Sequence, residues 1–143
     1  MWLTAFHKEI RLQVATGFIE RLRGLTGRES LGAHEALWIR PCRAIHTFHM
    51  KIPIAVFLLD SQSRVFAVRP CVPPRRVVWV LGTHSVIEMA AIDSRVVESA
   101  VAALQQAVSV WQGGVRRDAK YACVGGVKAR IKNTANHDVD RHL

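Results

Sequence analysis

Cysteine is scarce in this sequence and follows no recognisable pattern. The three cysteines, Cys42, Cys71 and Cys123, are odd in number and widely spaced, and none belongs to a CxxC pair. A disulfide framework needs an even set of cysteines, and a zinc ribbon needs closely spaced pairs. The sequence therefore argues against both classes and predicts reduced thiols.

Long apolar runs are also missing. The longest one, Ile52 to Leu59, includes Pro53 and is far shorter than the roughly 18 to 20 residues that a membrane-spanning helix needs. Met1 to Arg11 interrupts its few apolar residues with charged ones, unlike a secretory signal. We expect a cytoplasmic protein without a membrane span.

The composition favours one globular domain. Half of the 143 residues are hydrophobic, which is enough for one core, and the formal net charge of +9 favours contact with anionic surfaces. Beyond Gly113 and Gly114 large apolar residues are rare and seven Lys or Arg residues occur. We predict a single domain over residues 1–112 and a basic, partly disordered tail over 113–143.

The apolar patterns predict strands in the first two thirds of this domain and a long helix at its end. Ile10 to Val14 alternates like a half-buried strand, and a short helix capped by Thr16 follows. Apolar runs then predict a hairpin and two short strands, at 54–59, 65–68, 77–81 and 85–89. After Asp93 the spacing becomes helical, at Val97, Val101, Leu104, Val108 and Trp111.

Three segments together resemble the domain of unknown function 192 family. They are RLRGLTGR at 21–28, IHTFHMKIPIAVFLLD at 45–60 and SVIEM at 85–89, and their order and spacing agree with that family. The resemblance covers about Ile10 to Ala91 and implies no activity. It implies an α+β fold with a small, curled, barrel-like antiparallel sheet, to which our patterns add one short N-terminal helix and one C-terminal helix.

The chain departs from the family pattern at several positions. Ala55 stands where relatives carry an aspartate, Ser63 replaces a turn glycine, and Ala90 and Ala91 replace a Pro-Ala-Gly turn. The Gly-Asp turn before a final strand is not recognisable, so the helix after Asp93 either replaces that strand or extends the family's helix. A site that used the missing aspartate would be altered here.

One segment contains side chains of the types that bind copper or zinc, at Cys42, His46 and Met50. A helix would place them on one face, whereas a strand would spread residues four apart over roughly 13 Å. The β-branched Ile45 and Thr47 favour an extended segment, so we expect no metal there. In that strand Phe48 and Met50 would pack inside and His46 would be partly buried.

Glu88 is a carboxylate within an otherwise apolar predicted strand. A buried carboxylate needs a charged or donor partner, and Arg21, Arg23 and Arg28 of the arginine-rich turn are the candidates. We expect an ion pair that holds the turn to the sheet. The tryptophans Trp38, Trp79 and Trp111 are expected to be core or half-core residues.

No catalytic motif of the GxSxG or HExxH type and no phosphate-binding glycine loop is present. We therefore expect a non-enzymatic accessory or binding protein without a cofactor, whose partner is a protein or a small anionic ligand. Two alternatives stay open: a metal-binding protein or enzyme using Cys42, His46 and Met50, and a nucleic-acid binder using the basic tail. The candidate binding residues are Arg23, Arg28, His46, Phe48, Met50 and Glu88.

Overall fold

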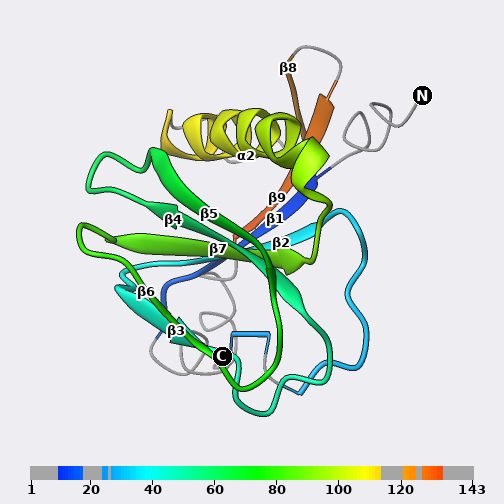
Figure 1. The fold of residues 1–143 in the computed structure, drawn as a ribbon. Coiled ribbons are helices and arrows are strands. Elements are labelled where there is room, and N and C mark those ends of the chain that lie inside the picture. The colour runs from blue at the N-terminus through cyan, green and yellow to red at the C-terminus, as the bar shows by residue number, and fades with distance from the viewer. Residues whose placement is uncertain (1–9, 18–23, 26, 114–120, 125–126, 134–143) are drawn as a thin grey trace, which may run out of the picture.

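The computed structural model describes residues 10–17, 24–25, 27–113, 121–124 and 127–133. Figure 1 shows three layers: a large sheet in the middle, helix α2 on one face and a two-stranded ribbon on the other. The strands are β1 Ile10–Ala15, β2 Glu35–Ile39, β3 Ala44–His46, β4 Ile54–Leu59, β5 Val65–Val72, β6 Val77–Trp79, β7 Ser85–Ala90, β8 Tyr121–Val124 and β9 Val127–Asn133. A 3-10 turn, η1 Ser94–Val96, precedes α2 Val97–Gln112.

The large sheet has seven strands in the order β5-β4-β7-β2-β1-β9-β8. Strand β1 is parallel to both β2 and β9, and the other pairs are antiparallel. The expected curled antiparallel barrel is therefore wrong: the sheet is mixed, and within the described residues its edges β5 and β8 do not close. The long connection over residues 16–34 allows β2 to return parallel to β1.

Two hydrophobic cores cover the two faces of this sheet. The helix-side core packs Trp38, Phe57 and Met89 of the sheet against Leu104 and Val108 of α2. The ribbon-side core packs residues of the opposite face beneath the β3–β6 ribbon; it includes Leu25, Leu37, Ile39, Ile45, Met50, Val56, Val78 and Val86. Strand β4 is buried along its whole length, which explains its continuous apolar sequence.

The structure confirms the strand at Ile10, the β4–β5 hairpin, β7 and the helix after Asp93. The Asp93 carboxylate accepts a hydrogen bond from the Arg95 N–H at 2.9 Å and caps the turn before α2. The short helix predicted after Thr16 falls mainly on residues 18–23, outside the described residues. The predicted tail contributes β8 and β9 to the sheet, and its separation from the domain at residue 113 stays a prediction.

The helices give no indication of a membrane span. In the described parts of the chain, none is both long and apolar enough to span a bilayer.

Candidate functional site

The β3–β6 ribbon has one buried face and one exposed face. Its register pairs Ile45 with Val78, and both side chains are buried against the main sheet. Its flanking pairs, Ala44 with Trp79 and His46 with Val77, point the other way, because successive side chains on a strand alternate. Trp79 is 64% exposed and Val77 is 63% exposed. The ribbon therefore presents apolar side chains to solvent.

Thr47 holds the turn after β3 to the loop before β6. Its buried hydroxyl donates to the Pro73 carbonyl at 2.8 Å and accepts from the Arg76 N–H at 2.9 Å. Its backbone N–H donates to the Arg76 carbonyl at 2.8 Å, and its carbonyl accepts from the Arg75 N–H at 3.0 Å. Two segments that are distant in sequence are thereby fixed side by side.

The predicted extended segment over 45–50 is correct only as far as His46. The chain then turns, and His49 adopts a positive φ of 66°. Met50 is buried as predicted, but Phe48 is 43% exposed and His46 is exposed, which corrects the inward and partly buried positions expected for them. The rings of His46 and Phe48 lie 5.3 Å apart, so Phe48 adjoins the outer face of the ribbon.

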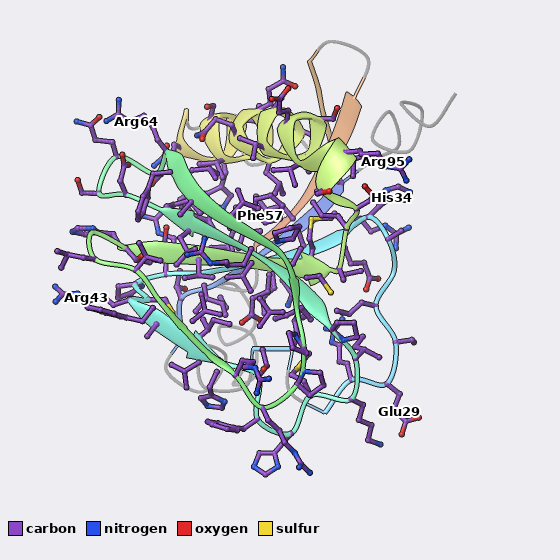
Figure 2. All side chains as sticks on the ribbon, viewed as in Figure 1. Glu29, His34, Arg43, Phe57, Arg64 and Arg95 are labelled. Atoms are coloured by element: carbon purple, nitrogen blue, oxygen red, sulfur yellow. The ribbon has the colours of Figure 1, made fainter. Side chains whose placement is uncertain are left out.

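Basic residues lie at both ends of the ribbon. Arg43 directly precedes β3, and Figure 2 shows it beside the ribbon. Arg75 and Arg76 directly precede β6, and all three side chains are exposed. The sequence contains no Asp or Glu at positions 36–59 or 61–87. We call the following set the ribbon surface: Arg43, His46, Phe48, Arg75, Arg76, Val77 and Trp79.

The proposed metal ligands do not converge. His46 lies on the outer face of the ribbon, whereas Met50 belongs to the core beneath it. The Cys42 thiol contacts the Ala44 carbonyl at 3.2 Å. Among the described residues no group of three or more His, Cys, Asp or Glu side chains is arranged to hold a metal ion. The metal-binding alternative needs Cys42, His46 and Met50 to share one coordination point, and the geometry does not provide one.

Glu88 lies on β7 and is only 4% exposed. Removal of its carboxylate from water raises its pKa to about 7, and a hydrogen bond from the Leu25 N–H acts in the opposite direction. The expected ion pair with Arg28 is wrong, because Arg28 pairs with Glu35 at 3.5 Å. Arg21 and Arg23, the other expected partners, lie outside the described residues.

The carboxylate of Glu88 lies so close to Gly24 of the arginine-rich turn that this position requires a glycine. Gly24 has a φ of +48°, and a Cβ atom there would lie 3.3 Å from the Glu88 Oε2 atom. A side chain would therefore meet both backbone strain and the carboxylate. The close approach places the backbone N–H of Leu25 where it can donate to Glu88.

An open cavity of about 210 Å³ lies beside this turn. Its polar lining comes from Arg11, Gln13, Arg28 and Glu35. Leu25 and Leu37, which line its apolar part, also flank Glu88, since Leu37 is its register partner on β2. Of the predicted residues, Arg28 lines this cavity and Glu88 lies beside its apolar part, whereas His46 and Phe48 belong to the ribbon surface.

Sequence analysis missed the most exposed aromatic residue of the described chain. Trp38 is fully buried and Trp111 is partly buried, as expected, but the core or half-core position predicted for Trp79 is wrong. The alternation of Val77, Val78 and Trp79 next to two arginines was the available signal. A strand with one buried face would place Val78 inside and its neighbours outside.

Comparisons with known proteins define the family but no activity. No match was found among curated proteins. A structure of a protein of unknown function from Novosphingobium aromaticivorans DSM 12444 aligns with a TM-score of 0.55 and 19% identity, over 64% of this chain and 69% of that one. A proposed transcription regulator from Sinorhizobium meliloti 1021 aligns with a TM-score of 0.51 and 14% identity, over 64% and 74%.

These identities support a shared fold and nothing about function. The sequence model of the DUF192 family, described as "Uncharacterized ACR", matches residues 1–111. That match spans most of the chain and includes the ribbon, the arginine-rich turn and Glu88. The chain therefore belongs to the DUF192 family.

Proposed function

We propose that this protein is a non-enzymatic binding domain whose ribbon surface contacts an acidic, apolar segment of another protein. The observation on which this proposal rests is the exposure of Trp79 and Val77 on a strand held rigidly by buried neighbours. Tryptophan and arginine are the residue types that most often dominate binding energy at protein interfaces. The ribbon surface combines both.

The apolar part of this surface is large enough to matter energetically. A tryptophan side chain buries about 150 to 250 Å² when covered, so the exposed 64% of Trp79 corresponds to roughly 100 to 160 Å². At about 25 cal/mol per Å², covering it contributes about 2.5 to 4 kcal/mol. Val77 and Phe48 extend the patch on either side of His46.

The charge of this region selects the chemistry of the partner. Arg43, Arg75 and Arg76 are exposed, and no acidic residue occurs in the two sequence stretches that form the ribbon. Complementary charge steers association and disfavours basic partners. A partner segment with aliphatic or aromatic residues flanked by Asp or Glu satisfies both the apolar centre and the basic rim.

Selection from a random peptide library displayed on phage provides the test. The recovered sequences are expected to combine Asp or Glu with bulky apolar residues, and labelled synthetic copies should bind the wild-type protein in fluorescence anisotropy. Trp79→Ala should weaken binding strongly and Trp79→Phe only partly. Arg95→Ala, which alters an exposed arginine within η1, is the charge control and should bind like wild type.

The same proteins should be titrated with a labelled single-stranded oligonucleotide. Tight binding of the oligonucleotide that is unchanged in Trp79→Ala and lost on deletion of residues 113–143 would favour the nucleic-acid alternative. Selected peptides without acidic residues, or equal affinity in Trp79→Ala, would contradict the proposed surface. We also propose that the protein is cytoplasmic, a location that is consistent with such a partner.

A further inference from the structure

The cavity beside the arginine-rich turn is separate from the ribbon surface. It is bounded by β1, β2 and the turn at Leu25 and Arg28. Figure 2 labels Glu29 and His34, the neighbours of this region, on the side of the molecule opposite Arg43. A ligand in the cavity would therefore leave the ribbon surface free. The cavity and the ribbon surface are two separate sites.

Among the described residues around the cavity, the guanidinium of Arg11 is available to a ligand. Arg28 forms an ion pair with Glu35 at 3.5 Å, and both side chains are nearly half exposed. An ion pair of this kind contributes little stability, because water screens it. Arg11 lines the same cavity and forms no ion pair in the part of the chain that the structure describes. Among the described residues that line the cavity, two arginines and one glutamate carry charge, and this balance favours an anion.

The placement of Arg11 and Gln13 suits a planar anion. They are two residues apart on β1, so their side chains leave the sheet on the same face. A guanidinium offers two parallel N–H groups that match the two oxygens of a carboxylate. The Gln13 amide, which also lines the cavity, supplies a further donor nearby.

The other wall of the cavity is apolar. Leu25 and Leu37 line it, and both belong to the ribbon-side core. The cavity has a volume of about 210 Å³ and is open to solvent, so it can admit a short hydrocarbon chain. Leu25 and Leu37 are 4% and 8% exposed, and an inorganic anion would leave this small apolar area uncovered.

We infer that this cavity binds a small aliphatic monocarboxylate, with its carboxylate on Arg11 and Gln13 and its hydrocarbon chain over Leu25 and Leu37. This inference is independent of the ribbon surface and goes beyond protein binding. The carboxylate of Glu35 already pairs with Arg28. It therefore competes with the carboxylate of the ligand for this guanidinium.

Titration of the full chain with hexanoate, followed by ¹H–¹⁵N NMR, tests this site. Saturable shifts are expected at the amides of residues 11–13 and 35–37. Arg11→Gln should weaken hexanoate binding by about ten- to a hundredfold, the range for loss of a charged hydrogen bond. Arg69→Gln alters an exposed arginine of β5 that belongs to neither site; it is the matched control and should leave the affinity unchanged.

Glu35→Gln provides a second variant with the opposite expected sign. Removal of the competing carboxylate frees Arg28, so hexanoate should bind several-fold more tightly. Hexanamide, the neutral analogue, should bind at least tenfold more weakly than hexanoate. Equal binding of the two probes, shifts with inorganic phosphate but none with hexanoate, or no effect of either variant would overturn the inference.

Discussion

Glu88 makes the stability of this protein depend on pH in an unusual direction. Burial raises its pKa from 4.5 to about 7 in the folded state. The unfolded chain releases this proton near its ordinary pKa, so between these pH values the folded protein binds more protons. The free energy of unfolding therefore falls as the pH rises from about 4.5 to about 7 and stays lowered above that.

The size of this loss follows from the same pKa values. One pKa unit corresponds to about 1.4 kcal/mol, so the full change is about 3 kcal/mol. Glu88→Gln removes the ionisation and keeps an oxygen that can accept the Leu25 N–H. We expect the unfolding free energy of Glu88→Gln to exceed that of wild type by about 3 kcal/mol more at pH 8 than at pH 4.

Urea unfolding followed by circular dichroism at several pH values measures this difference. Subtracting the two proteins cancels the contributions of other carboxylates such as Asp60 and Asp93, whose pKa values are lowered by hydrogen bonds from Arg64 and Arg95. Asp93→Asn is the control: the pKa of this carboxyl is lowered by the hydrogen bonds from Arg95, so the variant should show no gain over wild type between pH 4 and pH 8. A difference between Glu88→Gln and wild type that does not change with pH would refute the argument.

Two further substitutions test the layers that position the ribbon surface. Thr47→Val removes the hydroxyl that bonds to Pro73 and Arg76, so we expect a loss of about 1 to 3 kcal/mol and faster amide exchange at Arg76; unchanged protection there would contradict the role of Thr47. Leu104→Ala opens a cavity between α2 and the sheet and should cost about 2 to 5 kcal/mol in urea unfolding, whereas a loss below 1 kcal/mol would show that α2 is not tightly packed.

Local patterns predicted the elements whose signal is local. Helix α2 was predictable from apolar residues at helical spacing, and the β4–β5 hairpin from two apolar runs around a polar tip. The parallel pairing of β1 with β2 and β9 was not predictable in this way, because it joins segments far apart in the sequence. A strand's own residues do not specify which neighbour it pairs with.

The candidate sites show the same division. Burial of Glu88 followed from its apolar neighbours, but Arg28 could not be matched to Glu35 without the fold. The turn after His46 depends on bonds from Thr47 to partners 26 and 29 residues away, so the local preference for an extended segment was overruled. The exposure of Trp79, in contrast, follows from the alternation of side chains along β6 and was predictable from its own residues.

The affinity of a selected acidic peptide for wild type and for Trp79→Ala tests the ribbon surface most directly. Loss of about 2.5 to 4 kcal/mol of apolar contact corresponds to a dissociation constant raised about 60- to 700-fold, with Arg95→Ala equal to wild type. A ratio near one for Trp79→Ala, in a variant whose unfolding free energy matches wild type, would contradict the proposal that this exposed face of β6 binds the partner.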